Sequence, residues 1–133
     1  MQNLSKQDLI EKLEEIEFFP ELKNELDKYL SNFIQIKDLE IIKKLLTAGA
    51  NPNSKEDLDD YLLYLLHEFE VEKNTNGEII LSIIEYLLKN GANPNRVAMN
   101  NLRAYDYAVG RSTKEVAELL EKFGADKKLR EAI

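Results

Sequence analysis

Apolar residues recur along the chain at the three- and four-residue spacing of amphipathic helices. Residues 38–46 place most of their apolar side chains on one side of a helix, with Leu39 facing inward and Ile41 on the flank. Residues 79–88 carry a wider apolar stripe, which predicts a helix packed between neighbours on both sides. In residues 115–123 the stripe continues, but the outer face is polar. The pattern predicts an all-α fold in which the last helix acts as a cap.

These three helices share one type of ending. Gly-Ala-Asn-Pro-Asn follows the first two, at residues 49–53 and 91–95, and Gly-Ala-Asp follows the third, at residues 124–126. A glycine at this place adopts, at little energetic cost, the left-handed conformation that closes a helix, and the proline prevents the helix from resuming. The three glycines are 42 and 33 residues apart. The chain therefore contains an internal repeat of a helix and its stop signal.

On these helix ends and their spacing, the sequence resembles the ankyrin-repeat family over roughly residues 20–127, and most closely at residues 115–126. The resemblance implies an ankyrin-like helical-repeat stack of about three helix pairs with an N-terminal capping helix. The spacing of 42 residues is one 33-residue period plus 9 residues. A turn signal at residues 74–77 places these 9 residues in a connection, residues 70–77, between the two helices of the second repeat.

The chain departs from the family at the start of the inner helices. Where the family has Thr-Pro-Leu-His, this sequence has Tyr-Leu-Leu-Tyr at residues 61–64 and Arg-Ala-Tyr-Asp at residues 103–106. In the family, the Thr and the His of this motif supply hydrogen bonds that fix the turn, so this chain must order its turns by other contacts. A helical-repeat bundle without ankyrin hairpins is the alternative interpretation.

The chain is expected to fold as one domain, because 133 residues, of which 44% are hydrophobic, suffice for one continuous core. Ser5 is expected to cap the first helix, and Pro20 to begin the second, whose apolar stripe reaches residue 33. The expected units are the capping helices with the first inner helix (1–33), the first outer helix and its turn (34–55), the second repeat (56–95), the third repeat (96–127) and a tail (128–133).

The composition includes few of the residue types and motifs that form catalytic or metal sites. The chain has no cysteine and one histidine, His67, for which a structural role is expected because no second histidine or cysteine could complete a site. Glu56, Asp57, Asp59 and Asp60 lack the spacing and the glycine of a calcium loop. Helix capping and solvation explain this acidic cluster best, partner binding comes second and a metal last. No phosphate-binding or nucleophile motif occurs, so we expect no enzyme activity, no cofactor and no metal.

The charge and the hydropathy of the chain limit the classes of partner that it is expected to bind. A net charge of −7 repels a phosphate backbone, so we expect no nucleic-acid partner and favour a basic protein. No apolar stretch is long enough for a membrane span, and the N-terminus reaches Asp8 before any apolar stretch of signal-peptide length. The expected localisation is therefore cytoplasmic, with no membrane partner and a monomeric free state.

Small acidic proteins that resemble ankyrin repeats occur among bacterial immunity proteins, which cover the active site of a toxin. By this analogy we expect a non-catalytic binding module that inhibits or sequesters a partner protein such as a basic toxin or nuclease. A structural adaptor or scaffold subunit is the alternative. In the ankyrin pattern, the turn tips and inner helices line a concave face, which serves as a binding surface or is simply solvated. The residues placed there by the resemblance are Asp57, Asp59, Asp60, Tyr61, Tyr64, Glu68, Met99, Asn100, Leu102, Arg103, Asp106 and Arg111.

Overall fold

The computed structural model describes residues 5–53, 60–98, 101–111 and 113–132 of the chain. These residues contain no β-strand, and one isolated bridge joins Val97 to Arg103. The predicted all-α class is confirmed. The helical elements are α1 (Lys6–Glu14), the short 3-10 helix η1 (Ile16–Phe18), α2 (Pro20–Lys23), α3 (Leu26–Gln35), α4 (Leu39–Ala48), α5 (Tyr61–Lys89), α6 (Ala104–Gly110) and α7 (Lys114–Lys122).

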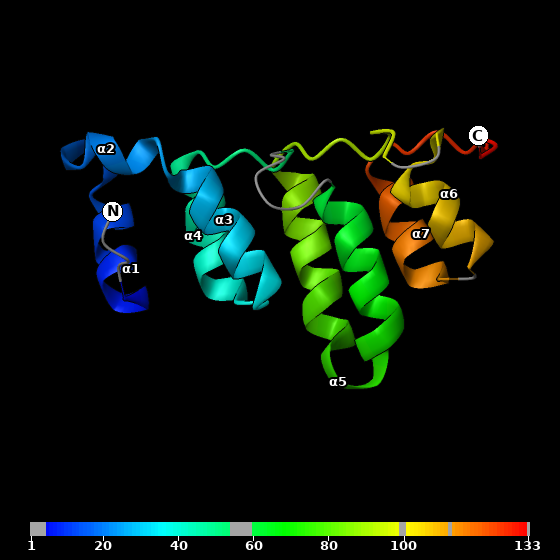
Figure 1. Ribbon diagram of the computed structural model, residues 1–133, viewed down its shortest axis with the longest axis horizontal. Helices are drawn as coiled ribbons and strands as arrows, with labels where there is room; N and C mark the ends of the chain where they lie inside the picture. Colours follow the sequence, from blue (N-terminus) through cyan, green and yellow to red (C-terminus); the bar gives the residue numbers. More distant parts are fainter. Residues whose placement is uncertain (1–4, 54–59, 99–100, 112, 133) are drawn as a thin grey trace.

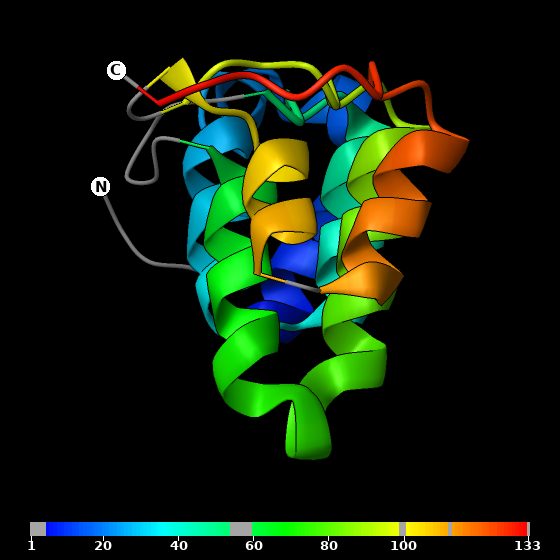
Figure 2. The ribbon, with the colours of Figure 1, turned by 90° about the vertical axis from the view of Figure 1, so that its right-hand side faces the viewer.

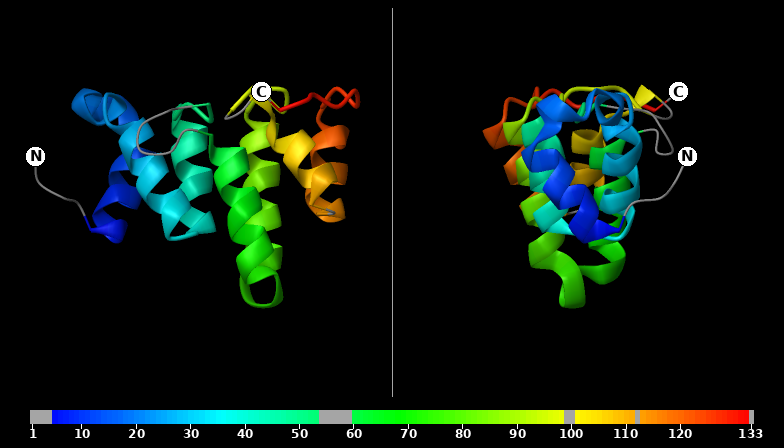
Figure 3. Two further views of the ribbon diagram at one scale, coloured as in Figure 1. Left: turned by 45° about the vertical axis from the view of Figure 1, so that its right-hand side comes forward. Right: turned by 90° about the vertical axis from the view of Figure 1, so that its left-hand side faces the viewer.

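The element α5 consists of two antiparallel arms joined by a sharp reversal (Figures 1 and 3). The helical hydrogen bonding continues along α5, but Glu72 has non-helical torsion angles, with φ −113° and ψ 18°. The reversal at Glu72 lies within the connection expected over residues 70–77, but the residues on either side of Glu72 are helical and lengthen both arms. The Asn76 amide donates to the Glu72 carboxylate at 2.6 Å, and the Thr75 hydroxyl donates to the Glu72 carbonyl at 3.2 Å. The residues of the turn signal thus stabilise the start of the second arm.

The helices stand side by side in a row that follows the order of the chain (Figure 1). Seen along the row, they form two layers (Figure 2). The inner layer contains α3, the first arm of α5 and α6, and the outer layer contains α4, the second arm of α5 and α7. The described parts of the segments that join one helix pair to the next, residues 49–53 and 91–98, run along one edge of the row, and the hairpin of α5 projects beyond its neighbours at the opposite edge (Figure 1).

Three helix ends have the same geometry, as the sequence predicts. Gly49, Gly91 and Gly124 have φ angles of 113°, 101° and 99°, which lie in the left-handed region. The residue after each glycine is a buried alanine whose N–H donates to a carbonyl five residues back, as from Ala50 to Leu45 at 3.0 Å. This arrangement satisfies carbonyl groups that the last turn of a helix leaves without partners.

A ladder of asparagine side chains connects these helix ends. The Oδ1 atom of Asn53 accepts from the main-chain N–H of Asn93 at 2.8 Å, and its Nδ2 donates to the carbonyl of Gly91 at 3.0 Å. Asn95 repeats both bonds one unit later, with the N–H of Asp126 at 2.7 Å and with the carbonyl of the third glycine at 3.1 Å. Each asparagine therefore holds the turn that follows the next helix pair.

The two ends of this ladder differ in chemistry. At its start, Asp27 accepts from the main-chain N–H of Asn51 at 2.7 Å. At its end, the position equivalent to Asn53 is Lys128, whose side chain has donors but no acceptor. Lys128 belongs to an extended C-terminal tail, residues 126–132, that lies along the same edge of the molecule (Figure 1). The sequence therefore ends the ladder where the last helix pair ends.

The apolar core lies between the two layers. Ile42 and Leu87 are fully buried there, as the apolar stripes predict. On α4 the predicted flank is wrong, because Ile41 is fully buried and Leu39 is partly exposed. The reason is that α4 packs against α1, α3 and α5, so more of its circumference is covered than one stripe indicates. None of the described helices combines the length and apolarity needed to cross a membrane.

The N-terminal helices agree only partly with expectation. The Ser5 hydroxyl oxygen accepts from the Asp8 N–H at 3.1 Å, and Pro20 begins α2, both as predicted. The single helix expected up to residue 33 is wrong, since it is divided at Asn24 and Glu25 into α2 and α3. This break lets α2 lie across the edge of the row while α3 joins the inner layer (Figure 1).

Candidate binding surface

The structure describes part of the surface that the sequence predicts. Leu102 lies at the turn before α6, where it is half-buried and its carbonyl accepts from the Ala98 N–H at 2.7 Å. Of the predicted positions, those that lie outside the described residues are Asp57, Asp59, Met99 and Asn100.

Two of the predicted surface residues are instead buried at the start of α5. Asp60 is 6% exposed, and its carboxylate accepts from the Leu62 N–H at 2.9 Å, so it caps the helix. Tyr61 is 1% exposed and belongs to the apolar core. The expected exposure of both residues is wrong, because the first turn of α5 faces the interior of the row.

Arg103 and Asp106 are also buried, at 3% and 8% exposure, so their expected exposure is wrong too. The Arg103 guanidinium donates to Asp106 from Nε at 3.0 Å and from Nη2 at 2.9 Å, and the Arg103 main-chain N–H donates to the same carboxylate at 2.9 Å. The hydrogen bond to Asp106 raises the pKa of Arg103. This pair orders the start of α6.

The protonation of Asp106 is set by two opposing influences. Burial on its own raises the pKa of this carboxyl group. The hydrogen bonds from the Arg103 side chain and from the main chain of Arg130 lower it, and they outweigh burial, so that the pKa of Asp106 lies below its ordinary value. Asp106 is therefore held as a carboxylate, and its role is to organise the chain around α6.

Tyr64 and Glu68 do lie on the inner layer, where they form a cluster with Lys37 and Glu72. Lys37 Nζ lies 2.6 Å from Glu68 Oε1 and 3.1 Å from Glu72 Oε2, and the Tyr64 hydroxyl donates to Glu68 at 3.3 Å. Lys37 follows α3 with a positive φ of 59°. This Lys37 cluster, with two carboxylates and one ammonium group, leaves a local excess of negative charge on the surface between α3 and α5.

The groups of the Lys37 cluster influence one another's protonation. Burial alone lowers the pKa of Lys37, but its hydrogen bonds to Glu68 and Glu72 outweigh burial and raise it. The pKa of Tyr64 is raised by burial and by the charge of Glu68. The pKa of Glu72 is lowered by the hydrogen bond from Asn76 and by the bond from Lys37. Near neutral pH Lys37 and Glu72 therefore keep their charges.

Arg111, the last predicted residue, lies in a second cluster on the other flank of the first α5 arm. Its Nη1 atom lies 2.8 Å from His67 Nδ1 and 3.0 Å from Glu70 Oε1. The guanidinium also covers the ring of Tyr107 at 5.1 Å, and the rings of Tyr107 and His67 meet edge to face at 6.1 Å. Because Arg111 only donates, His67 Nδ1 is the acceptor in this hydrogen bond.

Sequence reasoning missed three members of the Arg111 cluster. His67 and Glu70 are three residues apart on one helix, a spacing that puts them on one face. That spacing was the available signal, but it does not reveal that Arg111, 44 residues beyond His67, comes to the same place. Tyr107 is partly buried, with its ring against Arg111.

Ion pairs on both sides attach the projecting hairpin of α5 to its neighbours. On one side Lys37 bonds to Glu72, and on the other Lys73 Nζ lies 3.3 Å from Glu115 Oε2 of α7. Val71, next to Glu72 at the reversal, is 81% exposed. The inner-layer surface, defined here by Tyr64, His67, Glu68, Tyr107 and Arg111, thus continues toward the braced reversal of α5, where Val71 is an exposed apolar side chain among charged and polar residues.

The described residues contain no group of three or more histidine and carboxylate side chains that could hold a metal ion. Comparison of the sequence with protein-family models and with curated proteins found no match. The function of the surface is therefore inferred from its residues and their geometry.

Proposed function

We propose that this chain is a cytoplasmic, ankyrin-like helical-repeat protein that has no catalytic activity and binds a partner protein through its inner-layer surface. The repeat assignment is supported by three equivalent helix ends at Gly49, Gly91 and Gly124 and by the ladder of Asn53 and Asn95 between them. In such a stack each helix pair buries its apolar faces against its neighbours, and the row of pairs forms an extended concave surface that serves for binding.

The observation that carries this proposal is the fixed geometry of the side chains on the inner layer. Tyrosine and arginine are the residue types that contribute most to protein interfaces. Here Tyr64 is bonded to Glu68, and Arg111 is held by Glu70, His67 and Tyr107. Side chains that are already ordered lose little conformational entropy on binding, so their contacts contribute more to affinity.

The hairpin of α5 gives the surface a second contact element. It projects beyond the neighbouring helices (Figure 1), and Val71 near its tip is exposed to solvent. Because ion pairs brace the hairpin on both sides, it can present this apolar side chain without first becoming ordered. A partner would therefore lie against the inner layer and contact the tip at the same time.

A basic partner fits the chain best, because complementary charge accelerates encounter and fixes orientation. The net charge is −7, and the Lys37 cluster contributes to it on the proposed surface. We favour inhibition or sequestration of a basic toxin or nuclease, and a structural adaptor is the second candidate. These two candidate functions are distinguished by adding the chain to its purified partner, since only an inhibitor abolishes the partner's activity at a one-to-one ratio.

Site-specific photo-cross-linking in native cell extract tests the surface. A photoreactive amino acid at Val71 is expected to cross-link a partner, whereas the same amino acid at Glu118, which is exposed on α7 of the outer layer, is not. The partner from the Val71 reaction should then bind Arg111→Ala at least about tenfold more weakly than wild type. Equal cross-linking at both positions, or unchanged binding of Arg111→Ala, would contradict the proposal.

A further inference from the structure

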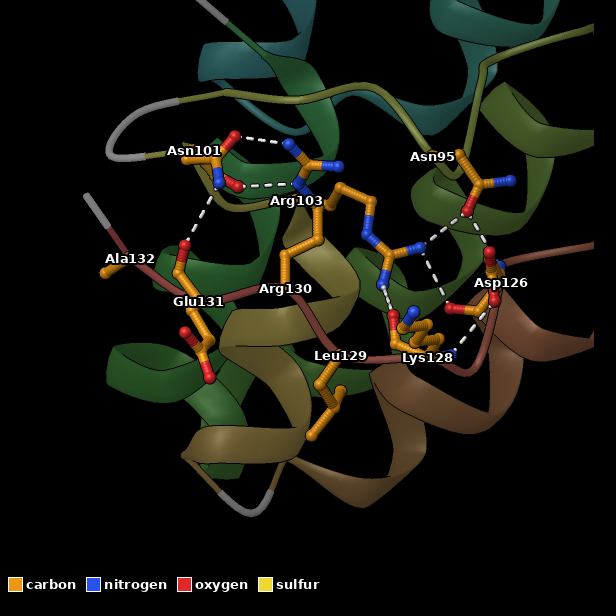
Figure 4. A pocket seen from close by; sticks show the side chains of 9 residues that line it. All are labelled: Asn95, Asn101, Arg103, Asp126, Lys128, Leu129, Arg130, Glu131 and Ala132. Atoms are coloured by element: carbon orange, nitrogen blue, oxygen red, sulfur yellow. Dashed lines mark hydrogen bonds between the residues drawn. The ribbon is translucent and has the colours of Figure 1, made fainter.

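The C-terminal tail is held at the start of α6 through its main chain (Figure 4). The Arg103 guanidinium donates to the carbonyl of Asp126 at 2.8 Å and to the carbonyl of Lys128 at 3.0 Å. Asp106 Oδ1 accepts from the main-chain N–H of Arg130 at 2.9 Å. The bonded residues 126, 128 and 130 alternate, and alternation is the property of one face of an extended chain.

Asn101 holds the far end of the tail. Its carbonyl accepts from Arg130 Nε at 2.7 Å, and its Nδ2 donates to the carbonyl of Glu131 at 3.1 Å. All residues of the tail, including Leu129, are exposed. We call Asn101, Arg103 and Asp106 the main-chain clamp, because most of their bonds to the tail reach main-chain atoms.

The buried position of the clamp makes an occupant necessary. Arg103 and Asp106 use part of their hydrogen-bonding capacity on each other. Carbonyl groups of the tail accept from the remaining donors of Arg103, and a main-chain N–H of the tail donates to Asp106. A buried ion pair with unfilled donors and acceptors is unfavourable, because these groups have lost water without gaining a partner. The clamp is therefore shaped for an extended chain that is held mainly through its main-chain atoms.

A hollow borders the clamp and the tail. It has a volume of about 850 Å³ and is lined by Asn95, by Asn101 and Arg103 of the clamp, and by the tail itself (Figure 4). The tail carries three cations, from Lys127, Lys128 and Arg130, and two carboxylates, from Asp126 and Glu131, so its net charge is +1 in a chain whose net charge is −7. The segment that now occupies the clamp is thus basic, which is the charge that the whole chain favours in a partner.

We infer that the main-chain clamp is a second binding site, apart from the inner-layer surface, for an extended basic segment of a partner protein. The tail occupies this site within the molecule and must leave before the segment binds. Because the tail is tethered close by, its effective concentration is in the millimolar range, and it competes strongly with a segment in solution.

Release of the tail is tested on the full chain with a matched pair of variants. Both Arg130→Pro and Arg130→Ala lose the side-chain bonds to Asn101, but only Arg130→Pro also loses the main-chain N–H that Asp106 accepts. Trypsin cleavage after Lys127 and Lys128, followed by mass spectrometry, is expected to be at least about tenfold faster in Arg130→Pro. Equal cleavage rates would overturn the role of the main chain.

Binding is tested with a fluorescein-labelled synthetic peptide that has the sequence of residues 125–133. By fluorescence anisotropy, full-length Arg130→Pro is expected to bind this peptide at least about tenfold more tightly than wild type, because its own tail no longer competes. The same peptide with a methyl group on the amide nitrogen of the residue equivalent to Arg130 is expected to bind about tenfold more weakly.

Three results would overturn the inference. The first is that the peptide does not bind Arg130→Pro at millimolar concentration, although trypsin cleavage shows that the tail of this variant is released. The second is equal binding of the methylated peptide. The third is a wild-type dimer that exchanges tails, detected by its molecular mass in solution, since the occupant would then be a second copy of this chain. Because no variant here alters the inner-layer surface, these results leave the proposed function untouched.

Discussion

The starts of α5 and α6 each bury a carboxylate, yet the two carboxylates organise the chain over different distances. Asp60 caps its own helix by accepting from the N–H of Leu62, two residues away. Asp106 pairs with Arg103, and together they bond main-chain atoms of the tail up to 25 residues away. A capping carboxylate therefore stabilises one helix, whereas a buried ion pair with spare donors can also attach a distant segment.

The largest expected effect separates these two carboxylates. Asp106→Ala leaves Arg103 as a buried cation without its counter-charge and removes the acceptor for the tail, so we expect a loss of about 3 to 5 kcal/mol in the free energy of unfolding. Asp60→Ala removes a helix cap and should cost about 0.5 to 2 kcal/mol. Urea denaturation of both variants measures the difference. Equal losses would mean that the ion pair and the helix cap contribute equally to the free energy of unfolding.

A second contrast concerns the second arm of α5 and α7, which are neighbours in the outer layer. The arm carrying Leu87 has neighbours on both sides in the row, and this side chain is fully buried. Leu87→Ala is expected to cost about 2 to 5 kcal/mol because a cavity forms. Leu119 of α7, at the end of the row, is partly exposed, so Leu119→Ala should cost less. Urea denaturation checks both, and the reverse order would contradict the stacked arrangement.

The features that sequence predicted correctly depend on few neighbouring residues. Gly49, Gly91 and Gly124 have positive φ angles, because the conformation that closes a helix is chosen within one turn of chain. Ser5 and Pro20 begin helices for equally local reasons. The repeat of these signals along the chain also indicated where the helix pairs lie.

The features that sequence missed depend on residues far apart in the chain. Arg103 and Asp106 carry charges and were expected on the surface, but acceptors and donors in the tail complete their hydrogen bonding inside the fold. At residues 70–77 the sequence indicates a connection several residues long, yet the reversal is confined to Glu72, the residues around it are helical, and Gly77 packs closely against Phe69 of the first arm. In both cases tertiary contacts outweigh the local preference.

The pH dependence of stability tests how much the charge of Asp106 contributes to the ion pair. The pKa of Asp106 is lower in the folded chain than its ordinary value of about 4. Such a carboxylate stabilises the fold above that value, and the stabilisation is lost as pH falls through the lower folded pKa. We therefore expect the difference in unfolding free energy between wild type and Asp106→Asn to be constant from about pH 7 to 5 and to narrow below about pH 4. A difference independent of pH down to 2 would mean that the charge of Asp106 contributes nothing.

The smallest expected effects compare the middle of the asparagine ladder with its end. Asn53→Ala removes two side-chain bonds that hold the turn of the next helix pair, at Gly91 and Asn93, and we expect a loss of about 1 to 2 kcal/mol. Lys128 stands at the equivalent position after the third helix pair, and its side chain has no acceptor for a main-chain N–H. Lys128→Ala should therefore change stability by less than about 0.5 kcal/mol. Thermal and urea denaturation would detect this difference. A large loss in Lys128→Ala would show that its side chain fastens the tail, and that the tail is not held mainly through its main chain.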